Sequence, residues 1–262
     1  MGKTLLRVYR ICMLKPFLNQ VFKKDVLEIL KNLPDNSIDM IYGDPDYNVG
    51  INYSGKKFTK KWNKYISWYI ELNKECLRVL KPRGNMYMIN YPRQNAHLRT
   101  QFLEGNAHDV FEYVWVYRSN IGQSKRRFTT AHRSILHITK SKDNKFYKNQ
   151  VALPYQQPND KRIKAQIKKG SKGRMPYSWF HFNLVNNKSK EKTFHPCQIP
   201  VKLAEMLIKS CTKKGDSVFV LFGGSGNEIL LTKRLQRKFI SCEIHPTYFK
   251  RIQKRIRHSV IK

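Results

Sequence analysis

The sequence predicts an α/β domain built on a mostly parallel sheet. Segments with helical and strand-like hydrophobic spacing alternate along most of the 262 residues, a pattern typical of layered α/β proteins. Hydrophobic residues make up 40% of the chain, enough for one substantial core. A stretch rich in lysine and arginine interrupts the alternation, so we expect one α/β domain with a basic insertion.

Hydrophobic periodicity places the individual elements in order. The expected helices are 25–33, 62–80, 94–103, 199–211, 228–235 and 246–255. The expected strands are 37–43, 85–90, 112–117, 134–139, 217–222 and 238–243. The first helix ends before Pro34 and the second before Pro82, since proline cannot continue a helix. The polar segment that ends at Lys61 is expected to be a long loop.

The charge of the chain indicates a polyanionic partner. Lysine and arginine number 51 against 18 aspartate and glutamate, a net charge of +33. Residues 118–192 alone hold 19 basic and 3 acidic residues. Such an excess repels itself, and nucleic acid is the simplest partner that relieves it. A lysine-rich surface of the kind found in thermophiles or AT-rich genomes is the alternative.

Cysteine content and hydropathy bear on location. The five cysteines form no CxxC pair, which favours a reducing compartment and no structural metal. Arg7 and Arg10 interrupt the apolar N-terminal segment, and no run approaches the roughly 20 apolar residues of a membrane span. We therefore expect a cytoplasmic protein without a membrane partner.

A glycine-rich turn follows the strand expected at 217–222. Gly223, Gly224 and Gly226 allow a tight turn and close approach of a ligand to the start of the next helix. Glu243 ends the following strand, where a carboxylate can accept hydrogen bonds from both ribose hydroxyls. A nucleoside site is the functional interpretation, and a simple tight turn is the alternative. The chain has no GxxxxGKS loop, which disfavours phosphate transfer.

A second unusual turn follows the strand at 37–43. The sequence "DPDY" places Asp44, Asp46 and Tyr47 directly after this buried strand. A lone acidic turn is usually only a turn, so its meaning depends on the rest of the chain.

Together, "DPDY" and the later "FGGSG" resemble the DPPY or SPPY and FxGxG motifs of the amino-methylating DNA methyltransferases. Their order resembles the permuted β class of that family, over about residues 19–257. "HPCQIPVKLAEMLI" is similar to the family's HPxxKP segment, and "KRRFTTAHRSILHITKSK" to its following strand pair. The resemblance implies a Rossmann-like sheet that binds S-adenosylmethionine, with an inserted basic target-recognition region.

The resemblance also implies roles for residues of both motifs. Asp44 and the carbonyl of Pro45 would accept the N–H groups of a base amino group, and Tyr47 would stack on the flipped base. Such acceptors favour a pyramidal nitrogen whose lone pair attacks the sulfonium methyl in line. The cofactor-binding residues expected from the resemblance are Phe222, Gly223, Gly224, Gly226, Glu243, His195 and Asp44.

The resemblance divides the chain into three parts. Residues 19–117 would form the catalytic half, 118–192 the target-recognition region, and 193–262 the cofactor-binding half. The expected DNA-binding residues are Lys125, Arg126, Arg127, Arg174, Tyr177 and Trp179, through phosphate contacts or through base edges and stacking.

The sequence departs from the family pattern at three points. Asp46 stands where the family has proline, Val220 and Leu221 stand where Asp-Pro is frequent, and Asn227 stands where threonine is usual. Pro196 and Cys197 resemble the nucleophile of cytosine C5 methyltransferases, but a structural cysteine beside a helix-starting proline is the preferred interpretation.

The expected function is a site-specific DNA methyltransferase that uses S-adenosylmethionine, with cytosine N4 preferred as target. "DPDYNVGINY" and "AHRSILHITKSKDN" resemble archaeal CTAG-type cytosine N4 enzymes, whereas Asp in the first motif position is commoner in adenine N6 enzymes. An RNA or protein methyltransferase and a non-catalytic nucleic-acid-binding module are the rival classes. Expected partners are double-stranded DNA, a cognate restriction endonuclease and a second copy in a homodimer.

Overall fold

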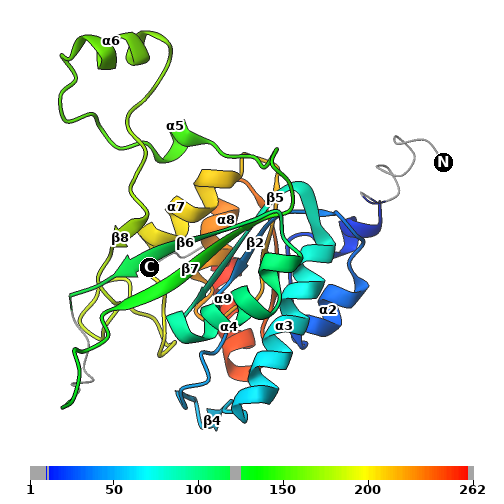
Figure 1. Ribbon diagram of the computed structural model, residues 1–262. Coiled ribbons are helices and arrows are strands. Elements are labelled where there is room, and N and C mark those ends of the chain that lie inside the picture. The colour runs from blue at the N-terminus through cyan, green and yellow to red at the C-terminus, as the bar shows by residue number, and fades with distance from the viewer. Residues whose placement is uncertain (1–9, 11, 119–124, 259–262) are drawn as a thin grey trace.

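A computed structural model describes residues 10, 12–118 and 125–258 (Figure 1). Within these residues an eight-stranded sheet lies between two layers of helices, and its strand order is β1-β10-β9-β2-β5-β7-β6-β8. Five neighbouring strand pairs are parallel and the two pairs that involve β7 are antiparallel. The predicted α/β architecture with a mostly parallel sheet is therefore confirmed.

The strands of this sheet come from both halves of the chain. They are β1 (Gln20–Phe22), β2 (Ile38–Gly43), β5 (Leu80–Asn90), β6 (Asp109–Val116), β7 (His132–Thr139), β8 (Trp179–His181), β9 (Ser217–Val220) and β10 (Lys238–Cys242). Every residue of β2 is buried because helices cover both faces of the sheet. Ile41 faces one helical layer, and Met40 and Tyr42 face the other.

Two groups of helices form the outer layers. The first group is α2 (Val26–Asn32), α3 (Trp62–Val79) and α4 (Pro92–Gln101), and the second is α7 (Val201–Cys211), α8 (Asn227–Arg234) and α9 (Pro246–His258). The smaller helical elements are η1 (Lys15–Phe17), η2 (Leu103–Gly105), α5 (Lys148–Val151) and α6 (Lys161–Lys168). The long helices begin and end within a few residues of the predicted bounds.

Three parts of the structure differ from the sequence expectations. The segment expected to be one long loop contains the short hairpin β3 (Asn52–Tyr53) and β4 (Lys56–Lys57). The three-residue strands β1 and β8 were not predicted, because such short segments carry too little periodicity. β7 lies inside the sheet between β5 and β6, so a strand from the region predicted at 118–192 belongs to the central sheet.

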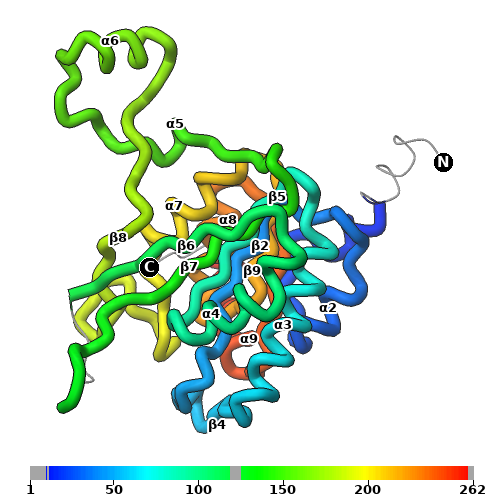
Figure 2. Tube along the Cα trace, viewed as in Figure 1, coloured from blue at the N-terminus to red at the C-terminus, as the bar shows by residue number. Residues whose placement is uncertain are grey.

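The carboxyl ends of β2, β9 and β10 meet at one edge of the sheet, because these strands are parallel neighbours. The amide of Leu221 donates to the Tyr42 carbonyl at 2.9 Å, and the amide of Gly223 donates to the Cys242 carbonyl at 2.6 Å. The two motifs, nearly 180 residues apart in sequence, are thereby fixed side by side. Figure 2 shows β2 (blue), which precedes the "DPDY" motif, beside β9 (orange), which precedes the glycine turn.

None of the described helices is both long and apolar enough to cross a membrane. Arg7, which interrupts the apolar N-terminal segment, lies outside the described residues.

Candidate active site

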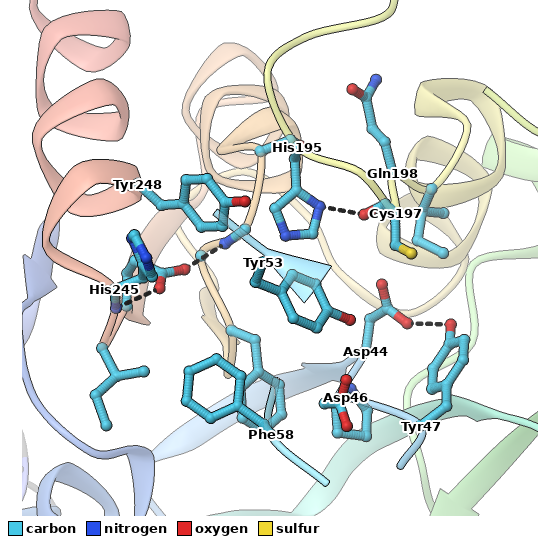
Figure 3. A pocket seen from close by; sticks show the side chains of 18 of the residues that line it. Asp44, Asp46, Tyr47, Tyr53, Phe58, His195, Cys197, Gln198, His245 and Tyr248 are labelled. Carbon is cyan, nitrogen blue, oxygen red and sulfur yellow. Dashed lines mark hydrogen bonds between the residues drawn. The ribbon is translucent and has the colours of Figure 1, made fainter. Parts of the chain in front are cut away.

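A cavity of about 210 Å³ opens at the edge of the sheet where β2, β9 and β10 end (Figure 3). Its walls come from the loop after β2, the segment before α7, the glycine turn after β9 and the start of α9. The predicted residues that line it are Asp44, Pro45, Tyr47, His195, Phe222, Gly223, Gly224 and Glu243. The fold thus brings together these eight residues, which the sequence assigned separately to catalysis and cofactor binding. Gly226, the remaining predicted cofactor residue, does not line the cavity and packs against Ile252.

Tyr47 is held rigidly beside Asp44. Its hydroxyl donates a hydrogen bond to Asp44 Oδ1 (Figure 3). Its backbone carbonyl accepts from Gln94 Nε2 at 2.7 Å, and its ring meets Tyr91 edge-on with centroids 5.4 Å apart. The ring and the carboxylate therefore have a fixed mutual orientation.

The Asp44 carboxyl has an unusual acidity. Burial raises its pKa from 3.8 to about 7, while the Tyr47 hydrogen bond and the nearby Arg133 oppose the rise and Asp46 adds to it. A carboxyl with a pKa near neutrality can both accept hydrogen bonds and take up a proton at physiological pH.

Arg133, at the start of β7, is a site residue that the sequence did not predict. Its guanidinium carbon lies 3.8 Å from the Tyr91 ring centroid and 5.4 Å from that of Tyr47. It also donates to the Tyr117 hydroxyl and, at 3.1 Å, to the His132 carbonyl. The antiparallel pairing of β7 with β5 brings this cation beside Tyr47, which lines the cavity, and no local sequence motif indicates this position.

The loop after β2 also contains Asp46, the departure from the family pattern. Its Oδ1 accepts from the amide of Asn48 at 2.8 Å, which closes the turn that proline would otherwise restrict. Its backbone carbonyl accepts from the Tyr65 hydroxyl at 2.8 Å. Local hydrogen bonds therefore order this loop in the absence of the second proline.

The glycine turn approaches Glu243 closely. Gly224 and Gly226 have φ of 51° and 80°, which a side chain rarely permits. A Cβ on Gly223 would lie 2.8 Å from Ile252 Cδ1. Glu243 Oε2 accepts from the amide of Gly224 at 2.9 Å and Oε1 from the amide of His245 at 2.7 Å. Both carboxylate oxygens are therefore fixed beside the cavity.

His195 lies in an aromatic cluster opposite the glycine turn. Its ring centroid is 5.5 Å from that of Tyr53 and 5.1 Å from that of Tyr248. Burial lowers its pKa to about 4, and its Nδ1 donates to the Cys197 carbonyl. The imidazole is thus neutral at pH 7.

Cys197 lines the same cavity, but it is not an activated nucleophile. Burial raises the pKa of its thiol to about 11, so the thiolate is scarce at neutral pH. This agrees with the interpretation of Cys197 as a structural cysteine.

The cavity is acidic although the chain is strongly basic. Among the described residues, its lining contains the carboxyl groups of Asp25, Asp44, Asp46, Glu228 and Glu243 and a single lysine, Lys60. Glu228 was not predicted; burial raises its pKa to about 8, and Asp44 adds to the rise. With this pKa Glu228 is largely protonated at pH 7, so the negative charge that favours a cationic ligand comes from the remaining carboxyl groups.

The predicted DNA-binding residues lie in two separate places. Lys125, Arg126 and Arg127 are exposed on the connection from β6 to β7, which leaves the sheet at the same edge as the cavity. Arg174 lies over the Tyr177 ring at 4.9 Å, and Tyr177 stacks near Trp179. These three do not line the cavity: Tyr177 precedes β8, toward the opposite edge of the sheet.

Comparison with known proteins identifies the family. The model of a DNA methylase family, N6_N4_Mtase, matches residues 38–254. The chain belongs to this DNA methylase family. Its members include enzymes that methylate N4 or N6 amino groups, so the chain is an S-adenosylmethionine-dependent DNA methyltransferase.

Several curated relatives are similar over most of their length. The Type II methyltransferase M.HpaI of Haemophilus parainfluenzae is 31% identical, over 88% of this chain and 72% of that protein. M.BglII of Bacillus subtilis is 29% identical, over 89% and 68%. The DNA adenine methyltransferase YhdJ of Escherichia coli K12 is 29% identical, over 86% and 78%.

Solved structures share the fold. The cytosine-N4-specific PvuII DNA methyltransferase has a TM-score of 0.67 at 19% identity, covering 90% of this chain and 85% of that one. The M1.HpyAVI complex with S-adenosylmethionine has a TM-score of 0.61 at 25% identity, covering 90% and 98%.

The lining of the cavity suits the cofactor of this DNA methylase. The closely packed glycine turn leaves backbone exposed to the cavity, as a nucleoside site requires. S-adenosylmethionine carries a sulfonium and an ammonium group, which the acidic lining complements.

Proposed function

We propose that this DNA methylase transfers a methyl group to the exocyclic amino nitrogen of a base flipped out of duplex DNA, with cytosine N4 as the target. The observation that carries the proposal is the joint position of Asp44, Tyr47 and Glu243 around one cavity. Asp44 would then provide a carboxylate for the amino group, Tyr47 a ring for the base and Glu243 a carboxylate for the ribose, all within one site.

The loop after β2 would act on the nucleophile. The amino nitrogen of a base is weakly nucleophilic because its lone pair is delocalised into the ring. The Asp44 carboxylate and the Pro45 carbonyl would accept its two N–H groups and so favour the pyramidal form. Bound S-adenosylmethionine supplies the methyl group from its sulfonium sulfur. Asp44 would then take up the proton that the nitrogen loses, as its pKa of about 7 suits a proton acceptor.

Tyr47 would form the platform for the flipped base. Its ring is held by the hydroxyl bond to Asp44 and by the edge contact with Tyr91. Arg133 supports both rings from the side of β7. An ordered platform lowers the cost of fixing the base in the attacking position.

The glycine turn and Glu243 would hold the nucleoside part of the cofactor. The remaining lone pairs of the Glu243 oxygens are available to ribose hydroxyls, because the two amides fix the carboxylate without occupying all its acceptor sites. Phe222 and neutral His195 contribute apolar and aromatic surface to the same wall.

The preference for cytosine N4 rests on residues 44–53 and 131–144, whose sequences resemble cytosine N4 enzymes. Adenine N6 is the second candidate. It is favoured by Asp in the first motif position and by the 29% identity to a relative described as a DNA adenine methyltransferase.

Lys125, Arg126 and Arg127 are proposed to contact phosphates. They are exposed on the β6–β7 connection, which leaves the sheet on the side where the cavity opens. A cognate restriction endonuclease is proposed as the functional counterpart, since M.BglII and M.HpaI are Type II methyltransferases.

The variant Asp44→Ala tests the mechanism. We expect methyl transfer to plasmid DNA to fall by at least about 100-fold, the effect of losing a positioned proton acceptor. Binding of S-adenosylmethionine, measured by calorimetry, should remain within a few-fold of wild type. Retained transfer would refute the role of Asp44, and the methylated nucleoside recovered with the wild type identifies the base.

A further inference from the structure

A basic arm projects from the domain at the end opposite the active site. The arm comprises residues 153–174 and contains α6 (Figure 1). Its base is closed by two backbone hydrogen bonds, from the Leu153 amide to the Arg174 carbonyl at 2.9 Å and from the Arg174 amide to the Leu153 carbonyl at 2.8 Å. A Cβ on Gly173 would lie 2.1 Å from the Leu153 carbonyl oxygen, so glycine is required for this closure.

The arm is ordered by its own polar contacts. The Tyr155 hydroxyl bonds to Gln166 Oε1 and to Ser171 Oγ, each at 2.8 Å. Asp160 caps α6 by accepting from the amides of Arg162 and Ile163. No side chain of α6 is buried. The helix is therefore exposed to solvent and contributes no side chain to the hydrophobic core.

The charge of the arm is almost entirely positive. Its basic residues are Lys161, Arg162, Lys164, Lys168, Lys169, Lys172 and Arg174, and its one acid is the capping Asp160. None of the ion pairs found among the described residues involves the arm. Lys161, Lys164 and Lys168 repeat at three- and four-residue spacing on one face of α6. Like charges at this spacing repel, and a polyanion would relieve the repulsion.

The topology fixes how far the arm is from the cavity. The arm lies between the end of β7 and the start of β8, at the edge of the sheet opposite to the carboxyl ends of β2 and β9. In Figure 1 α6 stands at the top, and β4, which follows the catalytic loop, at the bottom. Each residue of the eight-residue strand β6 spans about 3.3 Å, so the two edges are roughly 26 Å apart. For a duplex that runs along the strand direction, this span corresponds to roughly 8 base pairs at 3.4 Å each.

We propose that the arm binds the phosphate backbone of the target duplex in the flank of the methylation site, roughly 8 or more base pairs from the flipped base. This inference rests on the proposed function, because the flipped base defines the position of the duplex. The arm adds affinity without reading sequence, since lysine side chains on an exposed helix contact phosphates as point charges. It is thus distinct from Lys125–Arg127, which lie at the cavity edge.

The test compares two full-length variants that each lose four positive charges. The arm variant carries Lys161→Gln, Arg162→Gln, Lys164→Gln and Lys168→Gln. The control variant carries Lys74→Gln, Lys213→Gln, Lys214→Gln and Lys238→Gln, at exposed positions of the main domain. Binding to a hairpin with a 6-base-pair stem and to a mixed-sequence 40-base-pair duplex is measured by fluorescence anisotropy over a range of salt concentrations, and affinity is expressed per binding site.

On the 40-base-pair duplex, we expect the arm variant to lower the salt dependence of log affinity by about 3, the loss of three to four phosphate contacts at about 0.9 each. On the 6-base-pair hairpin stem, which spans roughly 20 Å at 3.4 Å per base pair and is too short to reach both edges, the arm and control variants should bind alike. Equal salt dependence of the arm and control variants on the longer duplex would overturn the proposal and point to an acidic protein as partner.

The same duplexes separate this inference from the proposed function. If the arm variant has a lower salt dependence than the control variant on the longer duplex but the wild type methylates no base, the phosphate contacts of the arm stand and the proposed reaction fails. If the wild type methylates DNA but the arm and control variants have equal salt dependence on the longer duplex, the reaction stands and the arm proposal fails. Thermal unfolding of both variants should match the wild type, because all eight positions are exposed.

Discussion

The pH dependence of methyl transfer provides a quantitative test of Asp44. Burial raises the pKa of this carboxyl to about 7, and only its ionised form can accept both a hydrogen bond and a proton. With this pKa, about 9% of the carboxyl is ionised at pH 6 and about 91% at pH 8. The transfer rate should therefore rise about tenfold between these values and be lost as the pH falls through 7.

The variant Asp44→Asn removes this titration with little change in shape. The amide oxygen of asparagine can still accept from the Tyr47 hydroxyl, so the loop should keep its conformation. The residual transfer rate of the variant should be flat between pH 6 and 8. Asp143→Asn, at an exposed carboxyl outside the cavity, is the matched control and should retain the tenfold rise.

The same pKa has a consequence for stability. An acid whose pKa is raised from 3.8 to about 7 destabilises the folded state when it is ionised. The penalty is absent below pH 4, grows between pH 4 and 7, and reaches at most about 4 kcal/mol above pH 7. Asp44→Asn should therefore raise the melting temperature at pH 8 and have little effect at pH 4.

Single-turnover transfer with excess enzyme measures the chemical step, because product release does not limit it. A wild-type rate that is constant from pH 6 to 8, or an Asp44→Asn variant that keeps the tenfold rise, would refute the assignment of Asp44 as proton acceptor.

Three further substitutions test the rest of the site. Glu243→Ala should weaken S-adenosylmethionine binding at least about tenfold, by loss of charge-assisted hydrogen bonds; a dissociation constant within twofold of wild type would contradict the ribose assignment. Arg133→Met should shift the midpoint of the pH–rate profile upward, because Arg133 lowers the pKa of Asp44; an unchanged midpoint would exclude this electrostatic role. Cys197→Ser should keep the transfer rate within about threefold, since the wild-type thiol has a pKa of about 11. A covalent complex between the wild-type enzyme and DNA would contradict this prediction, because it would show that Cys197 acts as a nucleophile.

The main elements of the site could be predicted because each follows a strong local signal. Asp44 and Glu243 come directly after buried strands, and parallel strands place such positions at one edge of a sheet. The glycines mark a turn whose backbone conformation few other residues tolerate. For these residues, the local sequence is therefore enough to predict the position in the folded structure.

The residues that were missed depend on long-range pairing. Arg133 reaches Tyr91 and Tyr47 only because β7 pairs antiparallel with β5, and sequence periodicity does not determine strand order. In the sequence, Glu228 is indistinguishable from an ordinary exposed acidic residue in the first turn of a helix. It is buried only because of tertiary packing. The basic region was recognised as a whole, but its separation into a connection near the cavity and a distant arm follows from the topology of β6, β7 and β8.

Nucleoside analysis of methylated DNA tests the central claim most directly. Unmethylated plasmid is incubated with the protein and S-adenosylmethionine, digested to nucleosides and analysed by mass spectrometry. We predict N4-methyldeoxycytidine in the wild-type reaction and none with Asp44→Ala. N6-methyldeoxyadenosine would contradict the choice of base while retaining amino methylation. The absence of both products, with cofactor binding demonstrated in the same preparation, would contradict DNA amino methylation itself.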